Sequence, residues 1–375
     1  MRLETLAVHA GGEPDAETGA IAPPIHLATT FRHGPAGERQ AGFEYVREGN
    51  PTQDRLETAL AALEQGAAAL AFGSGMAAMT ALLESLPAGS TLLIPLDCYT
   101  GLRVLAEEFL PHSGIRTQRV DMTDSAAVAA ALDAGTGADA IWLETPSNPQ
   151  LQVTDIAAIA ALARSRGARL FCDNTFATPA LQQPLTLGAA VVMHSTTKYF
   201  GGHSDVMGGA LVFARRDDDY ERVAHRRHVT GGVLAPFNAW LTLRGLRSLP
   251  ARMSWHCANA RRIADFLATH ARVAAVNYPG LATHVGHAVA ARQMRDFGAM
   301  LSFRVAGGRD AALTAAGRLR LIHNATSLGG CETLIEHRAS VEGAHPTSPQ
   351  DLLRLSVGLE HVDDLIADLA QALDF

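Results

Sequence analysis

One lysine in an unusual setting is the residue of this sequence best suited to do chemistry. Lys198 lies in a segment rich in hydroxyl groups, 194–199, and a glycine-rich stretch, 201–209, follows it. The apolar run 189–193 precedes it and is typical of a buried strand. A lysine at the end of such a strand, flanked by small residues, indicates a fixed amine that forms a Schiff base beside a cofactor.

Composition and charge exclude several classes of protein. The chain has 375 residues, of which 47% are hydrophobic and 18% charged, as expected for a globular enzyme of more than one domain. A net charge of -7 without a basic cluster argues against nucleic-acid binding. We find no apolar run long enough to span a bilayer and no signal-peptide core at the start.

The cysteines and histidines give no sign of a disulfide framework or a metal site. The four cysteines are widely spaced and form no Cys-x-x-Cys pair, so we expect reduced thiols and a cytoplasmic location. His284 and His287 have a helix-compatible spacing, but no third ligand lies nearby in the sequence. We therefore predict that the chain holds no metal.

The distribution of periodic segments suggests three parts. Residues 1–49 are rich in Gly, Pro and Thr and predict an extended arm that lies against another surface rather than folding alone. Residues 50–245 alternate helical patterns with short apolar runs and predict a large domain. A long helical segment, about 236 to 270, predicts a connector into a smaller α/β domain, 246–375, that ends in an amphipathic helix.

The short apolar runs of the middle part predict the fold class. They are continuous rather than alternating, which indicates strands buried on both faces of a mostly parallel α/β sheet. Ligands of such sheets bind at the carboxyl ends of the strands. Polar residues gather at those ends, in segments 97–99, 144–148, 173–174 and 195–198.

Three features match what pyridoxal 5'-phosphate (PLP) needs if Lys198 carries it. The glycine turn 73–78 opens a predicted helix and offers N–H groups to a phosphate. Asp173 ends a buried strand, where a carboxylate could pair with the ring nitrogen. Tyr99 could stack on the ring. Each feature alone also fits a structural role, and their order along the chain favours the cofactor.

The whole chain resembles the trans-sulfuration PLP enzymes of cysteine and methionine metabolism. This family includes cystathionine γ-synthase, γ-lyase and β-lyase and methionine γ-lyase. The resemblance implies the aspartate aminotransferase-like (type I) PLP-dependent transferase fold and an amino-acid substrate. It is carried by segments 45–52, 73–78, 144–149, 173–177, 194–199, 327–330 and 354–360.

The resemblance also implies roles around the cofactor. Lys198 matches the Schiff-base lysine and proton shuttle, Asp173 the partner of the ring nitrogen, and Tyr99 the stacking tyrosine that assists proton transfer. The implied phosphate contacts are Gly75, Met76, Ser195 and Thr197, joined by Tyr45 and Arg47 from a neighbouring subunit. The resemblance thus implies a homotetramer built from dimers with shared sites, in which the arm 1–49 contacts the neighbouring subunit.

The substrate side carries the implied carboxylate grip and most departures from the family pattern. Arg354 matches the arginine that binds the substrate α-carboxylate, supported by Asn148 and Ser327, with Arg103 as a further contact. Thr326 stands where γ-synthases and γ-lyases usually carry Glu. The family's His-Pro-Ala and Met-Thr-His become 337–339 and 341–343.

The predicted function is therefore γ-elimination or γ-replacement on sulfur amino acids or activated homoserine, as in methionine biosynthesis. Cystathionine β-lyase and methionine γ-lyase activities stay open as alternatives. More distant alternatives are a PLP-fold regulator without catalysis, for which the chain has no spare DNA-binding segment, and a metal-dependent lyase, for which it has no ligand cluster.

Overall fold

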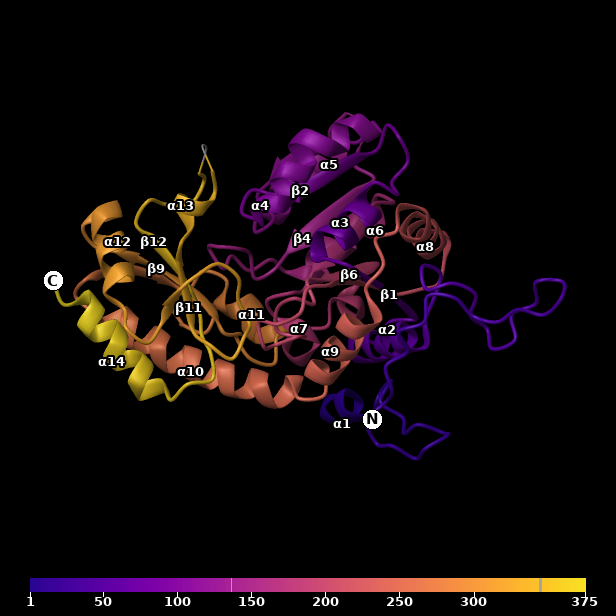
Figure 1. Cartoon of the computed structure of the whole chain (residues 1–375). Helices are drawn as coiled ribbons and strands as arrows, with labels where there is room; N and C mark the ends of the chain where they lie inside the picture. Colours follow the sequence, from indigo (N-terminus) through magenta and orange to yellow (C-terminus); the bar gives the residue numbers. More distant parts are fainter. Residues whose placement is uncertain (136, 344–345) are drawn as a thin grey trace.

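Two β-sheets divide the chain into a larger and a smaller part (Figure 1). The computed structural model describes residues 1–135, 137–343 and 346–375. The larger sheet lies within residues 68–213 and the smaller within residues 273–356. Helix α10 (Leu249–Thr269) contacts elements of both parts, and one apolar core continues along it from one part into the other.

The larger sheet has seven strands in the order β1-β7-β6-β5-β4-β2-β3. Its neighbours pair in parallel, except that β7 runs antiparallel to β1 and to β6. The prediction of a mostly parallel sheet is thus confirmed. In chain order the strands are β1 (Ala68–Phe72), β2 (Thr91–Pro95), β3 (Arg116–Val120), β4 (Ala140–Glu144), β5 (Arg169–Asp173), β6 (Val191–His194) and β7 (Gly209–Phe213).

Helices cover both faces of this sheet, which explains why its strands are apolar throughout. Leu70 and Phe72 of β1 pack with Met79 of α3 on one face. Ala69 and Ala71 belong to the core on the other face. The helices of this part are α2 (Pro51–Glu64), α3 (Gly75–Leu83), α4 (Thr100–Val104), η1 (Leu105–Phe109), η2 (Leu110–Ser113), α5 (Ser125–Asp133), α6 (Ile156–Ser165), α7 (Thr178–Leu181), η3 (Pro184–Leu187) and α8 (Asp218–Thr230).

The smaller sheet has five strands in the order β10-β11-β12-β9-β8. Only β10 and β11 pair in parallel among its described strands. Helices α10, α12 and α14 contact one another or its strands. The elements of this part are β8 (Val273–Asn277), α11 (His287–Gln293), β9 (Met300–Val305), α12 (Gly308–Arg318), β10 (His323–Asn324), β11 (Leu334–His337), α13 (Arg338–Val341), β12 (Leu352–Ser356) and α14 (Val362–Leu373).

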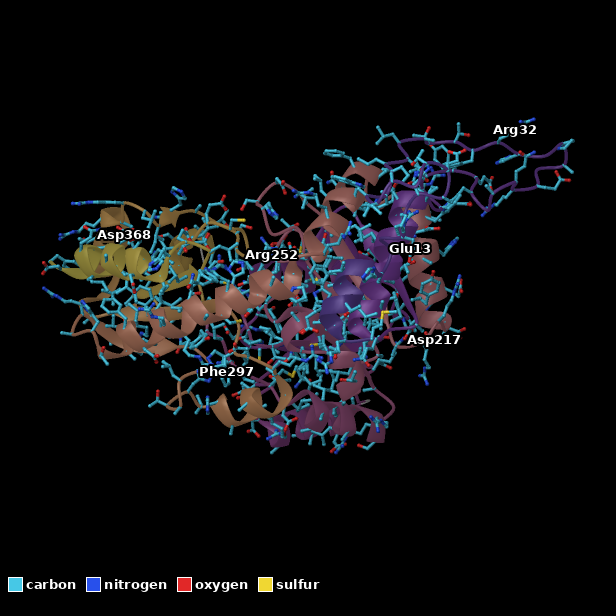
Figure 2. The ribbon with its side chains drawn as sticks, turned by 90° about the horizontal axis from the view of Figure 1, so that it is seen from below. Glu13, Arg32, Asp217, Arg252, Phe297 and Asp368 are labelled. Carbon is cyan, nitrogen blue, oxygen red and sulfur yellow. The ribbon has the colours of Figure 1, made fainter. Side chains whose placement is uncertain are left out.

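The N-terminal arm is less uniform than its sequence predicts. It contains a short helix, α1 (Leu3–His9), whose Leu3 and Ala7 are buried against the core. The rest projects from the body, and Arg32 lies far out on it (Figures 1 and 2). The indole of Trp240 donates to the carbonyl of Pro23 at 2.9 Å and fixes the base of the arm. The domain boundaries at residues 49/50 and 245/246 stay a prediction.

The single long helix predicted from about 236 to 270 is wrong. The segment forms α9 (Pro236–Leu246) and α10, and the break falls at 247–248. Pro250, in the first turn of α10, has no N–H for a continuing helix. The buried guanidinium of Arg252 donates to the carbonyls of Gly245 at 2.7 Å and Tyr199 at 2.8 Å, so the break also holds the segment after Lys198. Among the described helices none is both long and apolar enough to cross a bilayer.

A buried carboxylate on α14 holds the loop that leads into β10. Asp368 accepts hydrogen bonds from the backbone N–H groups of Arg320, Leu321 and Ile322, each at 2.9 Å, and Figure 2 shows it on the helix. Burial alone would raise the pKa of Asp368, but these donors hold it below its usual value. The chain continues from this loop to Thr326 and Ser327.

We expect Asp368→Ala to lower the free energy of unfolding by about 2 kcal/mol at pH 7, because three N–H groups lose a charged acceptor. Since the folded pKa lies below the unfolded one, this contribution is complete above about pH 5 and is lost as the pH falls through the folded pKa. Urea unfolding at pH 7, 5 and 3.5 measures it. Asp310→Ala, at an exposed carboxylate, is the control. If the free energies of unfolding of wild type and Asp368→Ala differ by the same amount at all three pH values, the assignment is contradicted.

Candidate active site

A cavity of about 290 Å³ lies at the carboxyl ends of β4, β5 and β6. The larger part contributes the start of α3, Tyr99 and the strand ends, and the smaller part closes the cavity with segment 326–328 and two arginines. The strand register places Glu144 directly beside Asp173. The expectation that the polar strand ends converge at one edge of the sheet is confirmed.

Lys198 lines this cavity four residues after the end of β6. Its Nζ donates to the Oγ of Ser327 at 2.7 Å, which joins the two parts of the chain across the cavity. Burial, and then the positive charge of Arg354, lower the pKa of Lys198 to about 8. A much larger fraction of this amine is therefore uncharged at neutral pH than of an ordinary lysine.

The sequence holds a further signal for Lys198 that neighbouring residues do not give. Lys198 is the only lysine in the chain, and the remaining basic residues among the 31 lysines and arginines are all arginines. A guanidinium serves at a surface position as well as an ammonium does, but its pKa leaves it without a nucleophilic amine. The lone lysine therefore places the chain's single side-chain amine in this cavity.

Two buried carboxylates lie side by side on the floor of the cavity. Asp173 accepts from the backbone N–H of Thr175 at 2.9 Å, and burial raises its pKa. Glu144 accepts from the backbone N–H groups of Tyr99 at 2.8 Å and Asn148 at 2.9 Å. Burial, and then the charge of Asp173, raise the pKa of Glu144 well above its usual value. Glu144 thus fixes the backbone at two predicted site residues.

The start of α3 forms an anion cradle. Ser74 caps the helix by accepting from the N–H of Ala77 at 3.0 Å, and the next N–H groups have no acceptor within the helix. A Cβ at Gly75 would lie 3.1 Å from the Cβ of Ser195, a tighter contact than most side chains make, so glycine keeps this turn uncrowded. The hydroxyl of Thr197 donates to the carbonyl of Gly208 and accepts from the N–H of Gly208.

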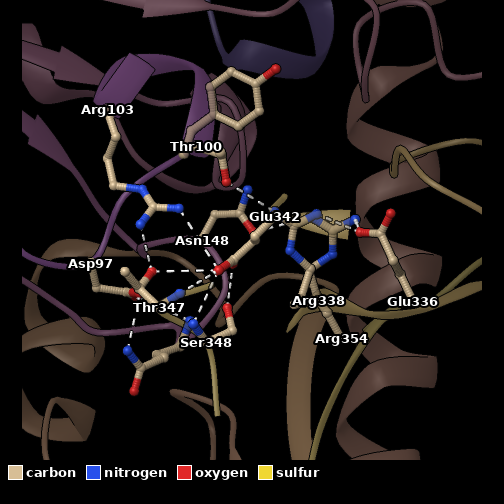
Figure 3. Close-up of polar contacts among 12 residues, drawn as sticks. Asp97, Thr100, Arg103, Asn148, Glu336, Arg338, Glu342, Thr347, Ser348 and Arg354 are labelled. Carbon is tan, nitrogen blue, oxygen red and sulfur yellow. Dashed lines mark hydrogen bonds and ion pairs between the residues drawn. The ribbon is translucent and has the colours of Figure 1, made fainter. Parts of the chain in front are cut away.

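Arg354 lies on the opposite wall and is buried; Figure 3 shows its polar contacts. It donates to the Oδ1 of Asn148 at 3.0 Å, the carbonyl of Ser327 at 3.1 Å and the carboxylate of Glu336 at 2.9 Å. Burial, and then the charge of Arg338, lower its pKa to about 10, so it stays a cation at neutral pH. The wall therefore presents a fixed positive group.

The structure brings most of the predicted site residues together and leaves three outside. The cavity is lined by Gly75, Met76, Tyr99, Asn148, Asp173, Ser195, Thr197, Lys198, Thr326, Ser327 and Arg354. Tyr45 and Arg47 lie on the arm, where the guanidinium is 5.0 Å from the tyrosine ring centre. Arg103 is buried behind the wall and donates to the Oγ1 of Thr347 at 2.8 Å.

Sequence reasoning did not identify three residues around the cavity as site residues: Glu144, Glu336 and Arg338. Glu144 belongs to the polar strand end 144–148 marked by the sequence, but its neighbour Asp173 is set by the strand register of the structure. Glu336 and Arg338 lie at the junction of β11 and α13, and no periodic pattern marks them as site residues. Arg338 lines the cavity, and Glu336 accepts from both Arg338 and Arg354.

Comparisons with known proteins agree with this geometry. Residues 4–374 match the family model for Cys/Met metabolism PLP-dependent enzymes. The chain belongs to this family. It is 49% identical over 375 residues to a cystathionine gamma-synthase of Mycobacterium tuberculosis, covering 98% of this chain and 96% of the relative. A cystathionine gamma-lyase of Bacillus subtilis is 40% identical over the full length of both chains.

A solved structure extends the likeness to three dimensions. The crystal structure of metB from Corynebacterium glutamicum superimposes with a TM-score of 0.96 at 44% identity, covering 100% of this chain and 98% of that one. The predicted type I PLP fold is confirmed. The family member described here is a PLP-dependent enzyme of cysteine and methionine metabolism.

The cavity fits PLP on three independent observations. The uncapped N–H groups and the absent Cβ at Gly75 leave a place for a phosphate. The buried Asp173 carboxylate has one hydrogen bond, to Thr175, and can take a ring N–H. The ring of Tyr99 lines the cavity while the residue keeps 41% of its surface exposed, which leaves a face for stacking.

We expect the Lys198 amine of the PLP-free protein to react with an acylating reagent in a profile centred near pH 8, because the protonated form below that pH is not a nucleophile. Replacing Arg354 by Met removes a positive neighbour and should move the profile to higher pH. Mass spectrometry of the single lysine-containing site reads the reaction directly. Arg226→Met, which removes a guanidinium far from the cavity, is the matched control. A wild-type profile centred near the usual value of about 10.4 would contradict the assignment.

Proposed function

We propose that this enzyme catalyses γ-replacement or γ-elimination, as a cystathionine γ-synthase or γ-lyase does, on activated homoserine or a sulfur amino acid. The observation that carries the proposal is the 49% identity to a cystathionine gamma-synthase along nearly the whole of both chains. That identity exceeds the 40% found for a gamma-lyase. Thr326, which lines the cavity where γ-enzymes of the family usually carry Glu, is the feature that keeps β-lyase chemistry among the outcomes to be tested.

The residues that hold PLP under this proposal come from three strand ends and one helix start. Lys198 would bond to the cofactor, the Asp173 carboxylate would accept from its ring nitrogen, and Tyr99 would pack against its ring. The N–H groups of Gly75 and Met76, with the hydroxyls of Ser195 and Thr197, would bind the phosphate. Bound PLP supplies an electron sink for the charge that is left on Cα after deprotonation.

The remaining steps belong to side chains of the protein. Arg354 binds the substrate α-carboxylate through its planar fork, and Asn148 holds that fork in place. The Lys198 amine, once free, takes the Cα proton and serves as the base at Cβ. Its lowered pKa suits both directions of proton transfer near neutral pH. Tyr99 lines the same cavity, and its hydroxyl would assist these transfers.

We further propose that the enzyme is a cytoplasmic homotetramer built from dimers with shared active sites. Two large apolar side chains on the arm, Ile21 and Leu27, are 69% and 68% exposed, which supports packing on a partner chain. Tyr45 and Arg47 would then reach the phosphate of the neighbouring site. The free cysteines Cys98, Cys172 and Cys257 are buried and unpaired with one another, which supports a reducing compartment.

We expect purified enzyme to convert an O-acyl-homoserine and cysteine into cystathionine. The test compares this pair with cystathionine, methionine and cysteine alone, and identifies the oxoacid that forms. Lys198→Ala and Lys198→Arg should lose turnover by at least about 10³-fold, because neither offers an amine to the cofactor. Borohydride reduction of the wild type should leave one PLP adduct on Lys198.

Each product of this panel decides between activities. 2-Oxobutyrate from cystathionine indicates γ-lyase chemistry, and pyruvate from cystathionine indicates β-lyase chemistry and contradicts the γ-assignment. A wild-type protein that gains no visible absorbance with PLP and no adduct on reduction contradicts the site itself.

Mixing inactive subunits tests the shared site. We expect Arg47→Ala and Lys198→Ala chains, refolded together, to regain up to about a quarter of the wild-type activity, because each mixed dimer holds one intact site and one doubly defective site. Arg39→Ala, on the same arm but paired with exposed Glu44, is the control for damage to the arm. Mixed dimers, verified by mass, that show no recovery would contradict a site completed by the neighbour.

A further inference from the structure

One wall of the cavity carries a charged pair in which both members depart from the family pattern. Arg338 replaces the proline of the family's His-Pro-Ala, and Glu342 falls in the segment that replaces Met-Thr-His. They lie four residues apart on and after α13. Arg338 lines the cavity next to Arg354, and the side chains of Arg338 and Glu342 are 8% and 2% exposed. The two replacements therefore meet at the substrate side of the site.

Arg338 and Glu342 belong to a network of side chains in which positive and negative groups alternate (Figure 3). One oxygen of Glu336 accepts from Arg338 at 2.5 Å and from Arg354 at 2.9 Å. The carboxylate of Glu342 lies 3.8 Å from Arg338 and 3.7 Å from Arg103. Glu342 is itself fixed by the backbone N–H groups of residues 347 and 348, at 2.8 Å and 3.1 Å. The network therefore cannot rearrange without breaking several buried contacts.

The network has a surplus of one positive charge. Three guanidinium groups, those of Arg103, Arg338 and Arg354, face the two carboxylates of Glu336 and Glu342. The α-carboxylate of an amino-acid substrate, bound on Arg354, would balance this one excess positive charge. A second negative charge on the substrate would find each remaining guanidinium already paired.

Among the described residues that line the cavity, the other ionisable side chains offer no free positive charge. Glu144 and Asp173 line the floor of the cavity and are acids, and Asp97 lies close enough to Glu342 for their charges to interact. Lys198 is the one further cation among the described lining residues, and the proposed function commits it to the cofactor. Burying an anion without a partner is unfavourable, so the cavity should reject it.

We propose that this wall makes the enzyme selective for substrates whose γ-substituent has no net negative charge, and that Glu342 is the residue that sets this selectivity. Under the proposed function, on which this inference rests, the preferred ester carries a neutral acyl group rather than a half-ester of a dicarboxylic acid or a phosphate. Glu342 keeps Arg338 and Arg103 neutralised and so withholds them from a distal anion.

The test compares kcat/KM for O-acetyl-homoserine and O-succinyl-homoserine, with cysteine and also without it, in the PLP-loaded enzyme. The wild type should favour the acetyl ester by at least about tenfold, and Glu342→Gln should reduce this preference by about tenfold, because two guanidinium groups lose their shared anion. Arg338→Gln should increase the preference. Glu84→Gln, which breaks an ion pair with Arg226 outside the cavity, should leave it unchanged.

The opposite shifts in Glu342→Gln and Arg338→Gln separate specificity from damage, because a misfolded wall lowers turnover of both esters alike. A wild type that favours the succinyl ester, or a Glu342→Gln enzyme with an unchanged ratio, overturns the inference. If neither ester turns over, the proposed function fails, and the inference is still decided by binding. L-Norleucine should then perturb the visible absorbance of bound PLP at lower concentration than L-2-aminoadipate does, and equal or reversed affinities overturn it.

Discussion

Burial of the Lys198 amine at the seam between the two sheets is the constraint on which the rest of the site depends. An amine that is taken out of water loses stability as a cation, and Arg354 across the cavity adds to that loss. The uncharged amine is the form that can bond to a carbonyl or accept a proton. Its hydrogen bond to Ser327 places this group where both parts of the chain contribute a wall. The chemistry therefore depends on how the two parts are held together.

Three arginines connect separate segments of the chain around the cavity, and each has a different set of hydrogen-bond partners. Arg252 donates to the carbonyl of Gly245, before the α9–α10 break, and to the carbonyl of Tyr199, which fixes the chain beyond Lys198. Arg354 joins Asn148 of the larger part to Glu336 of the smaller one. Arg103 reaches from the larger part to Thr347. Because each guanidinium has several donors in a rigid plane, one side chain can serve two segments at once.

Where the signal is local, the sequence predicts this fold well and names residues that line the cavity. Continuous apolar strands and polar strand ends lead directly to β4, β5 and β6 and to Asp173 and Lys198. The helix break at 247–248 was missed because apolar spacing continues across it, although Pro250 marks it. Glu144 was missed because its neighbour is set by strand register, which a single sequence leaves open. The site roles of Tyr45 and Arg47 stay predictions.

Arg338 and Glu342 show where sequence reasoning ends. Their four-residue spacing is typical of an exposed helical ion pair, which contributes little to stability or function. Their burial beside Arg354 changes the meaning of the same spacing, because in a wall shielded from water every charge must be matched by another. Charge balance in such a wall is a property of the whole network, and it fixes how many negative charges a substrate can bring. Specificity in this enzyme is thus set by paired residues that need not touch the reacting atoms.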